Sequence, residues 1–142
     1  MDMNADDKLA IHELLSRAAL GYDARDLDML RDCFAEQANM SMRIADGDLI
    51  GPYKGRDEIM ELMTSSMAQQ TDVRRHVISN IFFAEQPAAE AGEPLVVSNL
   101  TLLATENGKT QLLSAGVYRD RVSKVGGVWH IVERHLDLDS GY

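Results

Sequence analysis

Residues 74–80 read RRHVISN, and in this run a single histidine stands among apolar and β-branched residues. A run of this kind is typical of a half-buried β-strand, whose side chains point alternately to the two faces of a sheet. The alternation predicts one face made of His76, Ile78, Asn80 and Phe82. The stretch therefore predicts an imidazole on the inner face of a sheet, and His76 is the leading candidate for a chemical role.

Strand-like stretches continue from this point to the end of the sequence. They cover residues 73–83, 95–105, 110–121 and 128–137, and they are rich in Val, Ile, Leu and Thr. Turn signals separate them, with the tip of the first hairpin at 88–91 and the sharpest signal at Asn107-Gly108. Because the connections are short, we expect antiparallel neighbours.

The first half of the chain has the spacing of helices instead. Apolar residues recur every three or four positions, and Asp26 can cap a second helix. The pattern predicts helices over residues 6–22, 27–34 and 59–67, and a short β-hairpin over 40–44 and 49–53. Helices followed by a meander predict one α+β domain, residues 1–142, with helices covering one face of a curved sheet.

The composition narrows the choice of partners. The 142 residues carry 14 Lys and Arg against 23 Asp and Glu, a formal net charge of −9, which disfavours nucleic acid as a partner. No run approaches the roughly 18 apolar residues of a membrane span, and the acidic start lacks the basic-then-apolar pattern of a secretion signal. We therefore expect a cytoplasmic protein that binds neither nucleic acid nor membrane.

The cysteine and the methionines are expected to be packing residues, and the sequence offers no convincing set of metal ligands. The single cysteine, Cys33, excludes an intrachain disulfide, and its place in a helical pattern predicts a core position. Glu133 and His135 are the only closely spaced pair of possible metal ligands, so we expect no metal and no cofactor. The eight methionines fill core or pocket and would suit a bulky, flat, apolar ligand.

An acid–base pair is the most specific chemistry that the residues offer. Tyr22-Asp23 closes the first helical pattern, from which a carboxylate can meet His76 across a pocket. An Asp that accepts a hydrogen bond from one ring nitrogen fixes the tautomer and stabilises the imidazolium, which supports proton abstraction with loss or shift of a neighbouring group. The alternative is that Asp23 caps the helix junction and His76 is satisfied at a strand edge.

Further residues are candidates for contact with a ligand. Tyr118 could hydrogen-bond a carbonyl or phenol, Asn99 needs a partner if it is buried in its apolar strand, and His135 could reach the pocket if it shares a face with Trp129, Ile131 and Glu133. The full set of candidate substrate contacts is Tyr53, Ile78, Asn99, Tyr118 and His135. For Tyr118, simple packing is the alternative.

Five short motifs resemble the SnoaL-like branch of the nuclear-transport-factor-two-like superfamily. They read GYDARD at 21–26, LRDCFA at 30–35, YKGR at 53–56, RH at 75–76 and GVWHI at 127–131. Their order and spacing match over nearly the whole chain. The resemblance implies a cystatin-like α+β barrel: a cone-shaped, strongly curved antiparallel sheet that encloses a pocket and is covered by N-terminal helices.

The resemblance also implies roles for individual residues. The superfamily includes scytalone dehydratase, dehydrochlorinases, polyketide cyclases and the non-catalytic β subunits of ring-hydroxylating dioxygenases. Its dehydratase and dehydrochlorinase members carry an Asp at the end of the first helix and a His on the first long strand, which match Asp23 and His76. Tyr22 matches a tyrosine of scytalone dehydratase. A second histidine, expected near residues 99–101, is absent, so scytalone itself is not the expected substrate.

From residues and resemblance together we expect a cofactor-independent lyase or isomerase, dehydratase-like, that acts on a small cyclic or aromatic molecule. Asp23 and His76 would carry the acid–base step, with Tyr22 assisting. The alternatives are a non-catalytic β subunit of an aromatic-ring-hydroxylating dioxygenase, a small-molecule-binding protein, and a polyketide-cyclase-like enzyme. Apolar residues on both faces of the later strands predict a homodimer or higher homo-oligomer.

Overall fold

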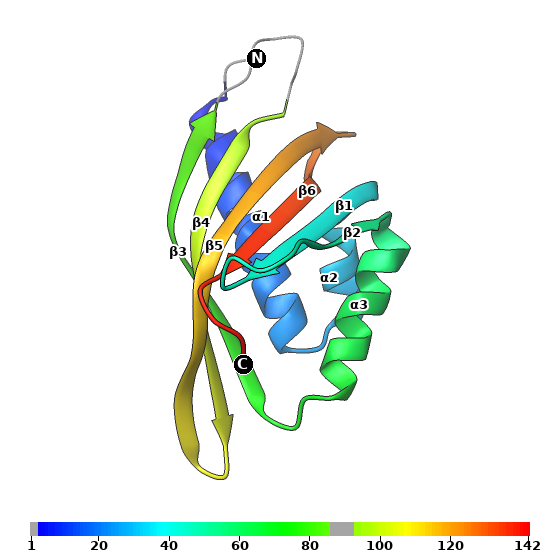
Figure 1. The fold of residues 1–142 in the computed structure, drawn as a ribbon. Coiled ribbons are helices and arrows are strands. Elements are labelled where there is room, and N and C mark those ends of the chain that lie inside the picture. The colour runs from blue at the N-terminus through cyan, green and yellow to red at the C-terminus, as the bar shows by residue number, and fades with distance from the viewer. Residues whose placement is uncertain (1–2, 86–92) are drawn as a thin grey trace.

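A computed structural model describes residues 3–85 and 93–142 of the chain (Figure 1). In order the elements are α1 (Ala5–Asp23), α2 (Leu27–Asp32), β1 (Phe34–Ile44), β2 (Ile50–Lys54), α3 (Arg56–Ala68), β3 (Val73–Glu85), β4 (Leu95–Glu106), β5 (Lys109–Val125) and β6 (Val128–Leu138). The predicted hairpin tip at 88–91 lies outside the described residues. The α+β class is confirmed, and no helix among the described residues is both long and apolar enough to cross a bilayer.

Helices α1 and α2 begin at side-chain caps, whereas Gly55 at the start of α3 has no side chain to make one. Asn4 and Asp7 form a capping box at the start of α1, and the Asp26 carboxylate accepts a hydrogen bond from the Met29 N–H at 3.1 Å, as predicted for a second helix. The prediction that this helix continues to Phe34 is wrong. The carbonyl of Cys33 instead accepts a hydrogen bond from the Ile131 N–H at 2.8 Å, and this pairing draws Phe34 into β1.

The described strands form one sheet in the order β2-β1-β6-β5-β4-β3. The meander from β3 to β6 and the β1–β2 hairpin are antiparallel, as expected. The expectation of a wholly antiparallel sheet is wrong for one pair, because β1 lies parallel to β6. Most of the chain lies between these two strands. A short connection makes two consecutive strands antiparallel, but it sets no direction for strands that are far apart in the sequence.

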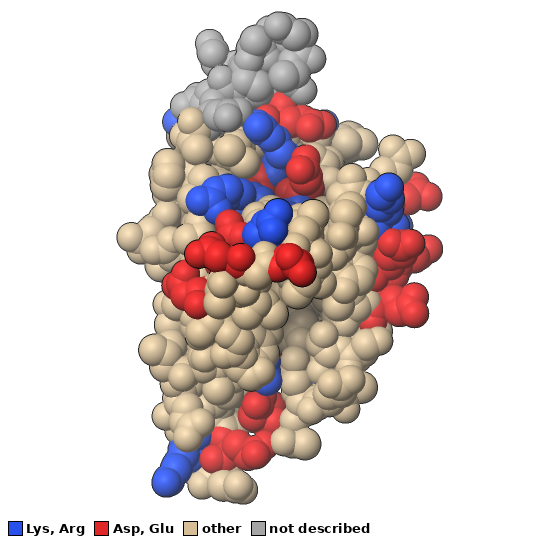
Figure 2. All heavy atoms as spheres, viewed as in Figure 1, with Lys and Arg blue, Asp and Glu red and all other residues tan. Residues whose placement is uncertain are grey.

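The sheet curls around the helices without closing into a barrel (Figure 1). Helix α1 packs against β3, while α3 packs against β1 and β2, so the concave face is covered from two sides. Gly21 permits close contact between α1 and α2, since a Cβ there would lie 2.9 Å from the Leu30 nitrogen. Acidic side chains gather along one side of the molecule in Figure 2, over α3, whose acidic residues are Asp57, Glu58 and Glu61.

A bulge in β3 changes which residues face inward. The register to β4 shifts between Ser79 and Phe82, and Asn80 adopts a φ of 53°, a left-handed conformation that Asn tolerates better than most residues. Beyond it Ile81 and Phe83 pack against the core. The prediction that Asn80 and Phe82 share the face of His76 is therefore wrong, and the Phe82 side chain is 55% exposed.

A second bulge has the same effect in β6. The register to β5 shifts where Val122 pairs with Ile131 and Arg121 with Glu133, which leaves Val132 without an opposite residue. Trp129 and Ile131 face inward before the bulge, and Arg134, Leu136 and Leu138 do so after it. Glu133 and His135 therefore lie on the outer face, contrary to the prediction that they share a face with Trp129.

Candidate functional site

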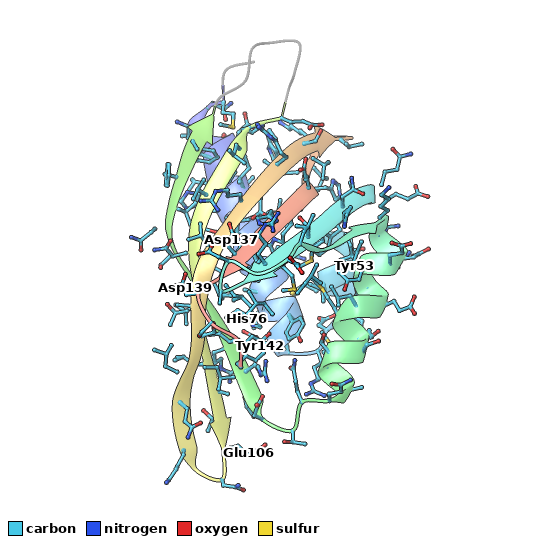
Figure 3. The ribbon with its side chains drawn as sticks, in the orientation of Figure 1. Tyr53, His76, Glu106, Asp137, Asp139 and Tyr142 are labelled. Carbon is cyan, nitrogen blue, oxygen red and sulfur yellow. The ribbon has the colours of Figure 1, made fainter. Side chains whose placement is uncertain are left out.

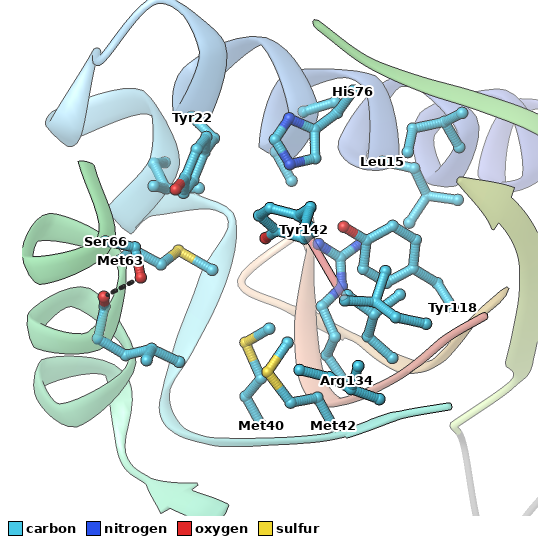
Figure 4. A pocket seen from close by; sticks show the side chains of 18 of the residues that line it. Leu15, Tyr22, Met40, Met42, Met63, Ser66, His76, Tyr118, Arg134 and Tyr142 are labelled. Carbon is cyan, nitrogen blue, oxygen red and sulfur yellow. Dashed lines mark hydrogen bonds between the residues drawn. The ribbon is translucent and has the colours of Figure 1, made fainter. Parts of the chain in front are cut away.

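A pocket of about 340 Å³ lies between the helices and the concave face of the sheet (Figure 4). Most of its wall is apolar and comes from leucine, isoleucine and methionine side chains. The polar side chains in the wall are Tyr22, Ser66, His76, Tyr118, Arg134 and Tyr142. A mostly apolar cavity of this size with a few convergent polar groups is typical of a site for a small organic molecule.

Asp23, the last residue of α1, holds His76 of β3 by two contacts. One carboxylate oxygen accepts the backbone N–H of His76 at 2.7 Å, and the other lies 2.6 Å from Nδ1 of the ring. The side chains of Asp23 and His76 are only 5% and 13% exposed. The contact predicted from the sequence is present, and the C-cap of α1 uses the backbone of Ala24 rather than the Asp23 carboxylate.

The Asp23 contact determines the tautomer of the imidazole. An ionised carboxylate can only accept hydrogen bonds, so we assign the proton of the neutral ring to Nδ1 and an open lone pair to Nε2. His76 lines the pocket, and its ring points into it (Figure 4). No hydrogen-bond partner of Nε2 is found among residues 3–85 and 93–142. The arrangement can therefore take up a proton from a molecule in the pocket.

Tyr22 lies beside this pair in the pocket wall. Its ring meets the His76 ring edge-on with 4.9 Å between centroids, and its hydroxyl accepts a hydrogen bond from Nε2 of Gln70 at 2.8 Å. Burial raises the pKa of Tyr22, partly offset by the Gln70 hydrogen bond. The hydroxyl therefore stays protonated and can donate a hydrogen bond.

A buried ion pair, missed by the sequence analysis, holds Arg134 in the wall of the pocket. Nε and Nη2 of Arg134 donate to the two carboxylate oxygens of Asp120 at 2.8 and 3.1 Å, and neither residue is more than 5% exposed. Burial acts to lower the pKa of Arg134, but the nearby Asp120 charge outweighs it and the pKa is raised. The sequence holds two signals of this pair. Asp120 lies two residues after Tyr118, so both side chains point to the inner face of β5. In β6 the apolar residues move from odd to even positions between Ile131 and Leu136.

Tyr118 packs against this pair. The guanidinium carbon of Arg134 lies 4.1 Å from the centroid of the Tyr118 ring. Burial raises the pKa of Tyr118 to about 12, against an opposing effect of the Arg134 charge. Tyr118 is thus a neutral hydrogen-bond donor on the pocket wall, in the place that the sequence predicts for it.

The sequence matches the model of one protein family, described as a SnoaL-like domain, over residues 3–135. The chain belongs to the SnoaL-like domain family. Comparison of the sequence with curated proteins finds no match. SnoaL-like proteins include isomerases and dehydratases but are heterogeneous in activity, so membership does not set the reaction.

Solved structures confirm the cystatin-like fold of this SnoaL-like domain. A protein of unknown function with a cystatin-like fold from Nostoc punctiforme matches with a TM-score of 0.79 at 23% identity, over 98% of this chain and 96% of that one. The β subunit of a putative aromatic-ring-hydroxylating dioxygenase from Novosphingobium aromaticivorans matches with a TM-score of 0.77 at 17% identity, over 92% and 88%. A structure from Catenulispora acidiphila in complex with S-DNPA matches with a TM-score of 0.79 at 16% identity, over 96% of each chain.

Three predicted substrate contacts of the SnoaL-like domain do not line the pocket. Tyr53 packs against the core from the edge strand β2, away from His76 and Tyr142 (Figure 3). Asn99 is exposed on the outer face of β4, because its neighbours in the strand point inward. The bulge in β6 turns His135 outward, where Nδ1 lies 2.8 Å from the Ser41 hydroxyl and Nε2 lies 2.8 Å from Asp137. The other two predicted contacts, Ile78 and Tyr118, line the pocket.

Cys33 and the possible metal ligands were also considered in the sequence. Cys33 is 2% exposed, as its predicted core position requires, and burial raises the pKa of its thiol. Within the described parts of the chain, no three side chains of His, Cys, Asp or Glu come together in a way that could hold a metal ion. The catalytic roles of Asp23, His76 and Tyr22 stay predictions.

Proposed function

We propose that this SnoaL-like domain is a cofactor-independent lyase or isomerase that acts on a small, neutral, cyclic or aromatic molecule. The observation that carries the proposal is the 2.6 Å contact between Asp23 and Nδ1 of His76, which leaves Nε2 open to an apolar pocket. A positioned base of this kind accelerates proton abstraction.

In the proposed step, Nε2 of His76 takes a proton from a substrate carbon. The electron pair of the broken C–H bond forms a double bond to the neighbouring carbon, and a group on that carbon leaves with its bonding electrons. In the isomerase variant, the double bond shifts and the proton returns at another carbon. Asp23 stabilises the imidazolium that forms, and the imidazolium then gives its proton to the leaving group or to the substrate.

Two donors on the opposite wall can stabilise the negative charge that develops. The first donor is Arg134. Its Nε and Nη2 donate to Asp120, and no acceptor for Nη1 of Arg134 is found in the described part of the chain. Tyr118 supplies a neutral hydroxyl beside it. Preorganised donors in a water-poor site stabilise a developing oxyanion or halide.

The balance of charge supports a neutral substrate. The charges of Arg134 and Asp120 cancel within their ion pair, which leaves the nearly buried carboxylate of Asp23 as the excess charge beside the pocket. A negative charge here disfavours an anionic substrate. An uncharged molecule that becomes negative only as it reacts meets this condition.

Nitrobenzisoxazole is a suitable probe, because removal of one carbon-bound proton opens its ring. The C–H and N–O bonds break, and a nitrile and a coloured phenolate form. We expect the protein to accelerate this reaction and His76→Ala to lower the rate by roughly 10²–10⁴-fold. EDTA should not alter the rate, since the proposed step uses side chains alone. A rate in His76→Ala equal to that of the parent, with both proteins folded by circular dichroism, would overturn the proposal.

A second candidate function is that of an assembly subunit. The close match to a dioxygenase β subunit in fold is the observation that favours it. In that case the pocket has no chemical role. A stoichiometric complex with a larger iron-containing subunit, together with no His76-dependent rate, would favour this function over the lyase or isomerase.

A further inference from the structure

The residues after β6 are bonded to β5 and reach the pocket, which Gly141 and Tyr142 help to line. The Asp139 N–H donates a hydrogen bond to the Ala115 carbonyl at 2.8 Å, and the Ser114 hydroxyl donates one to the Ser140 carbonyl at 2.7 Å. Ala115 and Ser114 both lie on β5, a central strand, so these two hydrogen bonds hold the segment against the middle of the sheet. It delivers the side chain of Tyr142 to the pocket.

The ring of Tyr142 is held in place from one side. The guanidinium carbon of Arg74 lies 4.9 Å from its centroid, and Arg74 is itself fixed by Asp72, whose carboxylate oxygens lie 2.8 and 3.4 Å from Nε and Nη2. Figure 4 shows the ring in the middle of the pocket region, near His76 and Tyr118. Tyr142 is nevertheless 62% exposed. An aromatic ring that is both positioned and open to water has a face available for another flat molecule.

We propose that Tyr142 is a specificity-determining residue that forms one wall of the ligand site. A flat aromatic ligand packs against the Tyr142 ring, with its reacting edge toward His76, and the ring limits the size of molecule that enters. Arg74 is a positioning residue that acts through Tyr142. The inference deepens the proposed function, on which the choice of a flat aromatic ligand rests.

Binding of naphthol, measured by its fluorescence, tests this wall without requiring turnover. Tyr142→Ala is expected to weaken binding by about 10-fold, which corresponds to about 1.4 kcal/mol. Tyr142→Phe should retain the affinity because it keeps the ring, and Arg74→Gln should have an intermediate effect because the ring is less well held. Phe82→Ala removes another exposed aromatic ring, on the outer face, and should leave binding unchanged.

The size limit gives a second readout, which a purely structural role would not change. Hydroxypyrene has four fused rings and should bind the parent poorly, whereas Tyr142→Ala should shift the affinity ratio toward hydroxypyrene by about 10-fold or more. Unchanged naphthol affinity and an unchanged ratio in a folded Tyr142→Ala protein would overturn the inference, as would a parent that does not bind naphthol. If His76→Ala lacks a catalytic effect but Tyr142→Ala still weakens binding, the lyase or isomerase proposal fails, while the proposed role of Tyr142 in ligand binding is supported.

Discussion

The carboxylate of Asp23 holds His76 by its backbone and its ring at once, with one oxygen 2.7 Å from the His76 backbone nitrogen and the other 2.6 Å from Nδ1. The first contact ties the end of α1 to the start of β3. The second orients the imidazole. Because one carboxylate makes both contacts, the position of the strand and the direction of Nε2 cannot change independently.

Asp23→Asn tests the chemical part of this contact. An amide nitrogen would donate to Nδ1 and place the ring proton on Nε2, where it blocks proton uptake. We expect the rate with nitrobenzisoxazole to fall by roughly 10²–10⁴-fold, while naphthol binding is retained. A folded Asp23→Asn protein with the parent rate would contradict the assigned role.

Tyr22→Phe should have a smaller effect than either change at the acid–base pair. The substitution removes the hydroxyl that accepts the Gln70 hydrogen bond and keeps the ring that contacts His76. We expect a rate loss of about 10-fold or less and a loss of stability of about 1 kcal/mol, the net value of one hydrogen bond. Steady-state kinetics and urea unfolding measure the two effects. A loss as large as that of His76→Ala would make Tyr22 itself the principal catalytic group.

The phenol of Tyr118 should ionise late. Burial raises its pKa from 10.0 to about 12. Because the folded value lies above the unfolded one, the stability that comes from keeping this phenol neutral is fully present below the unfolded pKa of 10.0 and is lost as pH rises through about 12. A titration of phenolate absorbance should show a late component that is absent from Tyr118→Phe. If the late component persists in the variant, it belongs to another tyrosine.

Breaking the buried ion pair should cost far more stability than breaking an exposed one. Asp120→Ala leaves the Arg134 guanidinium buried without its partner, and we expect a loss of about 3–5 kcal/mol in the free energy of unfolding. Asp57→Ala is the matched control: Asp57 pairs with Arg31 at 2.8 Å with its side chain 88% exposed, and its loss should cost less than about 1 kcal/mol. Equal losses in denaturant unfolding would contradict the burial argument.

Self-association through the outer face of the sheet is a further prediction. Val77 and Phe82 are 43% and 55% exposed there, although both are apolar. Light scattering should give twice the chain mass of 15.8 kDa. Val77→Glu should shift the protein toward monomer, whereas Leu9→Glu, at an exposed apolar position on α1, should not. A parent that stays monomeric at tens of micromolar would contradict the prediction.

Much of the fold could be predicted because its signals are local. Helical spacing located α1 and α3, alternation located the long strands, and the Asp26 cap marked the start of α2. The Asp23–His76 contact was also foreseeable, through the end of a helical pattern, the parity of a strand and a family resemblance. The pairing of β1 with β6 was not, because the strands lie far apart in the sequence and no turn determines their direction.

The sequence by itself determined the periodicity of each element, the single histidine of β3 and the acid at the end of α1. Only the tertiary structure decided which side of each strand meets the pocket along its full length. One unpaired residue in a β-bulge reverses the inward face of everything beyond it. The bulge at Asn80 therefore turned Phe82 outward, and the one at Val132 exchanged His135 for Arg134 in the pocket. A bulge depends on how two strands pair across the sheet. The change of face among the apolar residues of β6 signals a bulge, but only the pairing with β5 places it at Val132.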